Sequence, residues 1–260
     1  MTTQPDILEH IIGHTAILTL NNPPANTWTA DSLQALKHTV LKLNQNKTIY
    51  ALVITGQGDK FFSAGADLNL FADGDKVNAA SMAEHFGEAF EALSAFRGVS
   101  IAAINGYAIS GGLEVALACD LRIAEAQAKM ALPEASVGLS PCAGGTQNLT
   151  ALVGEGWAKR MILCGELIDA TKAEKIGLVE EMVEKGQALN AAVALAAKVA
   201  KQSPCSVNVC KPLIQAGRTM ARTQALPLER ERFIGLFDTE DQTEGVNAFF
   251  QKRTPKWKNG

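Results

Sequence analysis

Long hydrophobic runs are missing from this 260-residue sequence. No stretch reaches the roughly 18 consecutive apolar residues that a membrane-spanning helix needs. The first residues, Met-Thr-Thr-Gln-Pro-Asp, also lack the basic and apolar regions of a secretion signal. We therefore expect no contact with a membrane and a location in the cytoplasm.

An excess of positive charge is also missing. Lysine and arginine together number 24 against 27 aspartates and glutamates, so the formal net charge is −3. Proteins that bind nucleic acid usually carry a basic patch, because they must neutralise phosphates. No block of basic residues interrupts this sequence, and we expect no nucleic-acid partner.

Cysteine and histidine are sparse and scattered. The five cysteines are Cys119, Cys142, Cys164, Cys205 and Cys210, with no Cys-x-x-Cys pair among them. His10 and His14 lie four positions apart, but a glycine-containing turn separates them and no further ligand cluster adjoins them. Neither a disulfide framework nor a zinc site is indicated. We expect reduced thiols and no bound metal.

Apolar runs alternate with helix-like segments through the first two thirds of the sequence. Strands are expected at residues 7–12, 16–20, 51–55, 101–104 and 121–124. Helices are expected at residues 29–44 and 113–118, and glycine-rich loops at residues 56–75 and 105–112. A further helix is expected after residue 75, where Phe86, Phe90 and Leu93 recur at spacings of four and three. This alternation predicts an α/β core.

From about residue 146 onward the pattern becomes mostly helical. Helices are expected at residues 188–201, 226–237 and 241–252, with one strand at residues 178–183. No Gly/Ser-rich linker separates the parts. We predict an α/β core over residues 1–200, and a helical region over residues 201–260 that packs on the core or on a neighbouring subunit.

Two glutamates lie in apolar surroundings, where a carboxylate is costly unless it is paired, hydrogen-bonded or protonated. Glu114 stands between Leu113 and Val115, two residues after a glycine pair, and Glu134 follows Pro133. Such placement favours a chemical role. A structural role is also open for each, because Glu114 can belong to an exposed face and a Pro-Glu pair commonly begins a helix.

Five segments, in matching order and spacing, resemble the crotonase superfamily, the family of enoyl-CoA hydratases and isomerases. They are Phe-Ser-Ala-Gly-Ala-Asp-Leu (62–68), Asn-Gly-Tyr-Ala-Ile-Ser-Gly-Gly-Leu-Glu (105–114), Leu-Pro-Glu-Ala-Ser-Val-Gly (132–138), Ala-Gly-Gly-Thr-Gln (143–147) and Asp-Gln-Thr-Glu-Gly-Val-Asn-Ala-Phe-Phe-Gln-Lys-Arg (241–253). The likeness covers nearly the whole chain. It implies a spiral of repeated ββα units, with C-terminal helices that assemble the chain into a homotrimer or a dimer of trimers.

The resemblance also implies a substrate and a way of binding it. Members bind acyl-CoA thioesters, with no cofactor beyond the CoA of the substrate, and stabilise a thioester enolate with two backbone amides. By position, those amides belong to Ala66 and Gly111. The further residues implied for substrate or CoA are Ala64, Asp67, Leu68 and Cys142, together with Phe249 and Lys252 from a neighbouring subunit.

The two glutamates match those of the family's hydratases. The resemblance then implies that Glu114 activates a water as base and that Glu134 delivers a proton to C2 of a 2-enoyl-CoA, giving a 3-hydroxyacyl-CoA. A double-bond isomerase that uses Glu134 alone and a thioester hydrolase remain alternatives. A non-catalytic RNA-binding relative is disfavoured, because Lys37, Lys42 and Lys47 are too sparse on the first predicted helix.

Two positions depart from the family pattern. Ser110 and Cys142 stand where the family's hydratases often have glycine. The Cys142 side chain is expected to narrow or reshape the pocket. These departures bear on the range of substrates more than on the type of reaction.

Overall fold

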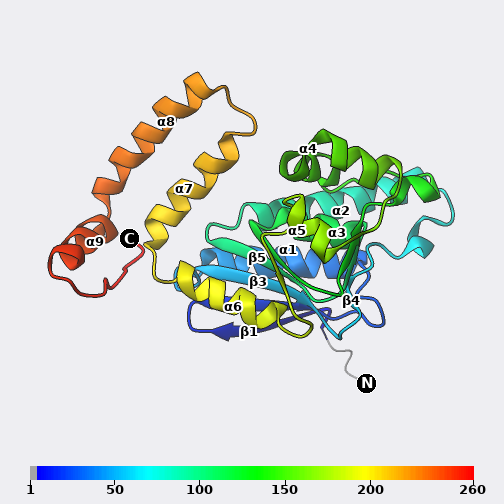
Figure 1. The fold of residues 1–260 in the computed structure, drawn as a ribbon, viewed down its shortest axis with the longest axis horizontal. Helices are drawn as coiled ribbons and strands as arrows, with labels where there is room; N and C mark the ends of the chain where they lie inside the picture. Colours follow the sequence, from blue (N-terminus) through cyan, green and yellow to red (C-terminus); the bar gives the residue numbers. More distant parts are fainter. Residues whose placement is uncertain (1–4) are drawn as a thin grey trace.

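A six-stranded sheet forms the centre of the computed structural model, which describes residues 5–260 (Figure 1). Its strands, in spatial order, are β1 (Ile7–Ile12), β2 (Thr15–Leu20), β3 (Ala51–Gly56), β5 (Val99–Ile104), β7 (Leu121–Glu125) and β10 (Glu181–Val183). β1 and β2 form an antiparallel hairpin, and every other neighbouring pair is parallel. The α/β prediction is therefore confirmed.

Alternate residues of the central strands fill two separate cores. In β3, Leu52 and Ile54 pack with α1 (Ala30–Gln45) and α2 (Lys76–Ser94), whereas Ala51 and Val53 pack with α6 (Ala188–Val199). Because successive side chains of a strand point to opposite faces, a strand covered on both sides must be apolar throughout. This burial explains the continuous apolar run at residues 51–54.

A second sheet of four short strands was not predicted from the sequence. It consists of β4 (Phe61–Ser63), β6 (Tyr107–Ile109), β8 (Lys129–Ala131) and β9 (Ile168–Asp169). β4 and β6 lie inside the segments expected to be loops. Strands of two or three residues are too short to produce a recognisable alternation of apolar and polar side chains. These strands matter because β4 and β6 lead directly into the glycine-rich segments.

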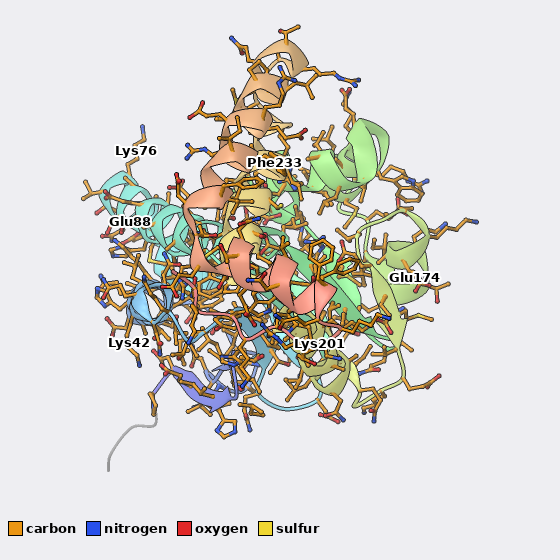
Figure 2. The ribbon with its side chains drawn as sticks, turned by 90° about the vertical axis from the view of Figure 1, so that its left-hand side faces the viewer. Lys42, Lys76, Glu88, Glu174, Lys201 and Phe233 are labelled. Carbon is orange, nitrogen blue, oxygen red and sulfur yellow. The ribbon has the colours of Figure 1, made fainter. Side chains whose placement is uncertain are left out.

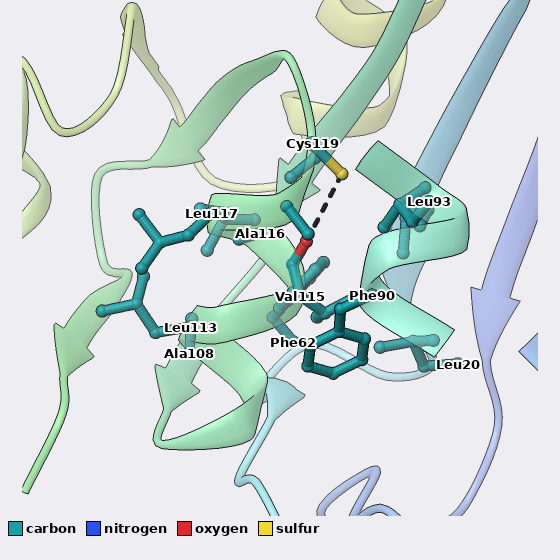
Figure 3. Packing of buried hydrophobic residues seen from close by; sticks show 14 of the residues in the cluster. Leu20, Phe62, Phe90, Leu93, Ala108, Leu113, Val115, Ala116, Leu117 and Cys119 are labelled. Carbon is teal, nitrogen blue, oxygen red and sulfur yellow. Dashed lines mark hydrogen bonds between the residues drawn. The ribbon is translucent and has the colours of Figure 1, made fainter. Parts of the chain in front are cut away.

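Helix α3 (Gly111–Ala118) lies in the middle of the larger core, and all eight of its residues are buried. Figure 3 shows Leu113, Val115 and Leu117 among the apolar side chains of neighbouring elements. At the end of the helix, the Cys119 thiol donates a hydrogen bond to the Val115 carbonyl at 3.5 Å. All five cysteines are free.

Four further elements complete the part of the chain between β4 and β10. They are the 3₁₀ turns η1 (Leu68–Phe71) and η2 (Glu134–Val137), and the helices α4 (Gly145–Leu163) and α5 (Ala170–Lys175). Among residues 5–260, no helix has both the length and the apolar character that crossing a bilayer requires.

The last helices project away from the sheet (Figure 1). This helical arm contains α7 (Pro204–Ala216), α8 (Arg222–Gly235), the 3₁₀ turn η3 (Leu236–Asp238) and α9 (Glu240–Phe250). Lys211 of α7 anchors the arm: its Nζ lies 2.8 Å from Asp120 Oδ2 and donates to the Phe96 carbonyl at 2.6 Å. The predicted division near residue 200 coincides with the end of α6 and stays a prediction.

The helical arm exposes large apolar side chains. Phe233 and Ile234 of α8 are 61% and 67% exposed, and Phe249 and Phe250 of α9 are 78% and 77% exposed. Figure 2 views the molecule from the side of these helices, with Phe233 labelled. Exposed apolar patches of this kind commonly mark a surface that another molecule covers.

The contact between α3 and β4 leads to a prediction about Gly112. A Cβ added there would overlap the Ser63 carbonyl oxygen and lie 2.9 Å from the Ser63 Cβ. We expect Gly112→Ala to lower the free energy of unfolding by about 1–3 kcal/mol, because a packed backbone cannot move aside cheaply. Urea denaturation measures this change.

Gly156 provides the matched control. It lies on α4, and a Cβ added there would meet no atom within 4 Å. Gly156→Ala should raise the free energy of unfolding by about 0.5–1 kcal/mol, because alanine favours the helix. Equal effects of the two substitutions would contradict the packing argument.

Candidate active site

One cavity of about 390 Å³ brings together most of the residues predicted from the sequence. Eight of the ten line it: Ala64, Ala66, Asp67, Leu68, Gly111, Glu114, Glu134 and Cys142. They come from three parts of the chain, namely the segment after β4, the start of α3, and the segment from η2 to α4. Phe249 and Lys252 are not among its lining residues.

Glu114 enters the cavity from a helix that has no exposed face. Its side chain is buried, and its Oε1 accepts hydrogen bonds from the amides of Ala143 at 2.8 Å and Gly145 at 2.9 Å. Burial disfavours the charged form and raises the pKa of this carboxyl to about 7, although the two amides act in the opposite direction. A carboxyl with this pKa exchanges protons readily near neutral pH.

Glu134 reaches the cavity from the first residue of η2. It is 7% exposed, and neither of its carboxyl oxygens has a hydrogen-bond partner of normal geometry among residues 5–260. Burial is the main cause that raises its pKa, and the backbone amide of Glu134 itself and then the Ser110 hydroxyl act in the opposite direction. Buried carboxyl oxygens rarely lack partners, so a partner from a bound molecule is the natural explanation.

Within residues 5–260, neither the Ala66 amide nor the Gly111 amide donates a backbone hydrogen bond. Trp28 pairs with residues 65–67 in an isolated parallel bridge. The Trp28 amide donates a hydrogen bond to the Gly65 carbonyl, and the Asp67 amide donates one to the Trp28 carbonyl. The Ala66 amide falls between these two bonds and faces the other way. Gly111 begins α3, where an amide has no partner within the helix.

Close packing joins the two segments that carry these amides. Gly65 has a φ of +87°, and a Cβ added to it would lie 2.7 Å from the Ser110 Cβ and 3.1 Å from the Gly111 nitrogen. Only glycine readily adopts this positive φ and also fits in the narrow gap between residue 65 and Ser110. The two segments therefore touch beside the cavity.

Cys142 stands at the side of the cavity near both glutamates. Burial, with added effects of Glu114 and Glu134, raises the pKa of its thiol to about 11. The reactive form of cysteine is the thiolate, which this environment disfavours. The arrangement thus gives no support to Cys142 as a nucleophile and leaves it as part of the wall.

Apolar wall residues were largely missed from the sequence. Ile109, Val137 and Leu139 line the cavity and were not anticipated, and Phe71 and Phe86 line it as well. Val137 and Leu139 come just after Glu134 and are 53% and 45% exposed. The sequence carries no signal for these two positions, because their exposure is a property of the folded chain.

Phe249 lies at the end of α9, and Lys252 lies two residues beyond the helix. Phe249 is largely exposed, and both residues are outside the cavity of their own chain. Their assignment to the coenzyme depended on a neighbouring subunit, and it stays a prediction.

The raised pKa of Glu114 predicts how stability depends on pH. The folded protein holds this proton with a pKa of about 7 against an ordinary 4.5, so the stabilisation is complete below pH 4.5 and is lost as the pH rises through 7. Glu114→Gln cannot ionise. Its free energy of unfolding relative to wild type should rise by about 2–3 kcal/mol between pH 5 and pH 8. Urea denaturation at both pH values tests this, and a constant difference would contradict it.

Comparison with known proteins agrees with the arrangement of the cavity. The family model described as enoyl-CoA hydratase/isomerase matches residues 12–260. A short-chain-enoyl-CoA hydratase of Clostridium acetobutylicum is 35% identical, with 93% of each chain covered. A 2,3-dehydroadipyl-CoA hydratase of Escherichia coli is 40% identical, with 93% of this chain and 94% of the relative covered.

Solved structures give the same result for the fold. The structure of Pseudomonas aeruginosa DspI is 64% identical with a TM-score of 0.96, and the match covers 99% of this chain and 98% of that one. An enoyl-CoA hydratase from Bacillus anthracis is 33% identical with a TM-score of 0.94, and the match covers 98% of this chain and 100% of that one. The chain described here therefore belongs to the enoyl-CoA hydratase/isomerase family.

Proposed function

We propose that this protein is an enoyl-CoA hydratase, which reversibly adds water to a 2-enoyl-CoA to give a 3-hydroxyacyl-CoA. One observation carries the proposal: two buried carboxyl groups, Glu114 and Glu134, face the same cavity beside the amides of Ala66 and Gly111. An isomerase needs one group that carries a proton between two carbons. Addition of water needs one group that takes a proton from the water and a second that gives a proton to C2.

The proposed chemistry assigns a task to each group. The amides of Ala66 and Gly111 donate to the thioester oxygen and stabilise the negative charge that develops there. Ionised Glu114 takes a proton from a water as its oxygen bonds to C3. Glu134 gives its proton to C2, and the enolate collapses to the thioester. Both new bonds form on the face of the substrate that the glutamates occupy, which makes the addition syn.

The similar proteins support the same substrate class. The relatives from Clostridium acetobutylicum and Escherichia coli are named as hydratases of short-chain enoyl-CoA and of 2,3-dehydroadipyl-CoA, respectively. We infer that this chain takes an acyl-CoA thioester and needs no cofactor beyond the CoA of its substrate. The cytoplasmic location and the lack of a nucleic-acid partner, both expected from the sequence, stay predictions.

Removing either carboxyl group should abolish hydration. Glu114→Gln and Glu134→Gln keep the shape of the side chain and remove its acid and base function, so we expect kcat to fall by about 10²–10⁴-fold. Loss of the conjugated enoyl-thioester absorbance of crotonyl-CoA measures the rate.

Glu125→Gln is the matched control, because Glu125 is a buried glutamate outside the cavity. It should keep most of the wild-type rate. Product analysis with a 3-enoyl-CoA separates the rivals, since an isomerase converts it to the 2-enoyl-CoA, and a thioester hydrolase would release free thiol. An inert wild-type protein, or a fully active Glu114→Gln, would contradict the proposal.

We also propose that the helical arm joins chains into a trimer or a dimer of trimers. The proposal is supported by the exposed apolar residues of α8 and α9, and by a family resemblance that extends through residue 253. A second copy of this chain is the proposed occupant. In that assembly Phe249 and Lys252 would close over the adenine of a neighbour's CoA.

The mass in solution tests this assembly. Analytical ultracentrifugation should give wild-type protein a mass of three or six times the 27.6 kDa of one chain. Phe233→Glu should reduce the mass, because it places a charge in the apolar contact. Glu231→Gln, an exposed change on the same helix, should leave it unchanged. A wild-type monomer would overturn the proposal.

A further inference from the structure

Ser110 adopts a backbone conformation that few residues other than glycine tolerate. Its φ is +55° and its ψ is −130°. For a residue with a Cβ this conformation is strained, and such strain persists only where the surroundings impose it. Here the Ser110 amide donates to the Ala131 carbonyl at 3.0 Å, and the Ser110 carbonyl accepts from Leu113 and Glu114.

The Ser110 hydroxyl does not cap the helix it precedes. Serine is common at this position because its oxygen usually accepts a bond from one of the first helical amides, in a backbone of negative φ. In α3 no such side-chain bond exists, and the amides of Leu113 and Glu114 use the Ser110 carbonyl instead. The hydroxyl is therefore available to the cavity, which Ser110 lines.

Glu134 is the group in the cavity that needs a donor. Both of its oxygens are buried without a partner among the described residues. The Ser110–Ala131 bond holds Ser110 against the end of β8, three residues before Glu134. The titratable groups that line the cavity are Asp67, Glu114, Glu134 and Cys142, none of which carries a positive charge. Backbone amides aside, the remaining donors are the hydroxyls of Thr27, Ser110, Ser136 and Ser140. Among these, the Ser110 side chain is the one that lowers the pKa of Glu134.

We propose that Ser110 is a positioning residue whose hydroxyl donates a hydrogen bond to Glu134 and holds its carboxyl toward C2 of the bound substrate. A serine hydroxyl rotates freely, and such bonds often tighten only in the complex with substrate. Strain at Ser110 is then the cost of placing an oxygen where glycine would offer none. The inference rests on the proposed function.

Two substitutions separate the hydroxyl from the strain. Ser110→Ala removes the hydroxyl and keeps the Cβ in its strained position, whereas Ser110→Gly removes both. We expect both variants to lose about tenfold in kcat with KM within twofold, because each lacks the same hydrogen bond to the Glu134 carboxyl. Ser110→Gly should melt at a higher temperature than Ser110→Ala.

The pH–rate profile and a double variant show whether the effect passes through Glu134. Loss of the hydroxyl removes a group that stabilises the carboxylate, so the basic limb should move to higher pH in both single variants. Adding Ser110→Ala to Glu134→Gln should change the residual rate by less than twofold.

Several results would overturn the inference. The first is a kcat and a pH–rate profile like those of wild type in both variants. The second is a loss of kcat in Ser110→Ala that is absent from Ser110→Gly. The third is a full tenfold loss when Ser110→Ala is added to Glu134→Gln. An inert wild-type protein would instead refute the proposed function. The two failures are therefore distinguishable.

Discussion

The contact between the Glu114 carboxylate and the amides of Ala143 and Gly145 is the constraint on which the cavity depends. Helix α3 is buried on every side, so its glutamate cannot turn toward bulk water. The two amides, at and just before the start of α4, compensate part of the free-energy cost of burying the carboxylate. They also fix the distance between α3 and α4. The incomplete compensation leaves the carboxyl with a pKa near neutrality.

Much of the fold is readable from the sequence because its central strands are buried on both faces. The runs at β3 and β5 are apolar throughout, and the position of each was predicted to within two residues. The short strands β4, β6, β8 and β9 were not, because two or three residues carry no periodicity. Helix α7 was also missed, since Pro204 and Pro212 interrupt its pattern even though a proline at the first helical position is well tolerated.

The residues of the candidate site likewise divide into those that the sequence reveals and those that it does not. Glu114 is conspicuous in the sequence, because an ionisable group inside an apolar run is costly. The contact between Gly65 and Ser110 joins residues 45 positions apart, and composition alone does not reveal it. The family resemblance implied only the pairing of the adjacent amides of Ala66 and Gly111. The apolar wall near Leu139 was missed because its side chains follow no regular element. The place of Phe249 is set by how chains assemble, which one chain does not determine.

The contact of Gly112 with Ser63 has a consequence for how this protein responds to damage. Ser63 ends β4 and leads within three residues to the Ala66 amide, while Gly112 adjoins the Gly111 amide. The spacing of the two proposed donors is therefore set by core packing rather than by any side chain of the site. Slight loosening of the core, too small to register in thermal unfolding, would then widen the gap between the donors. Turnover is accordingly the most sensitive reporter of the integrity of this core.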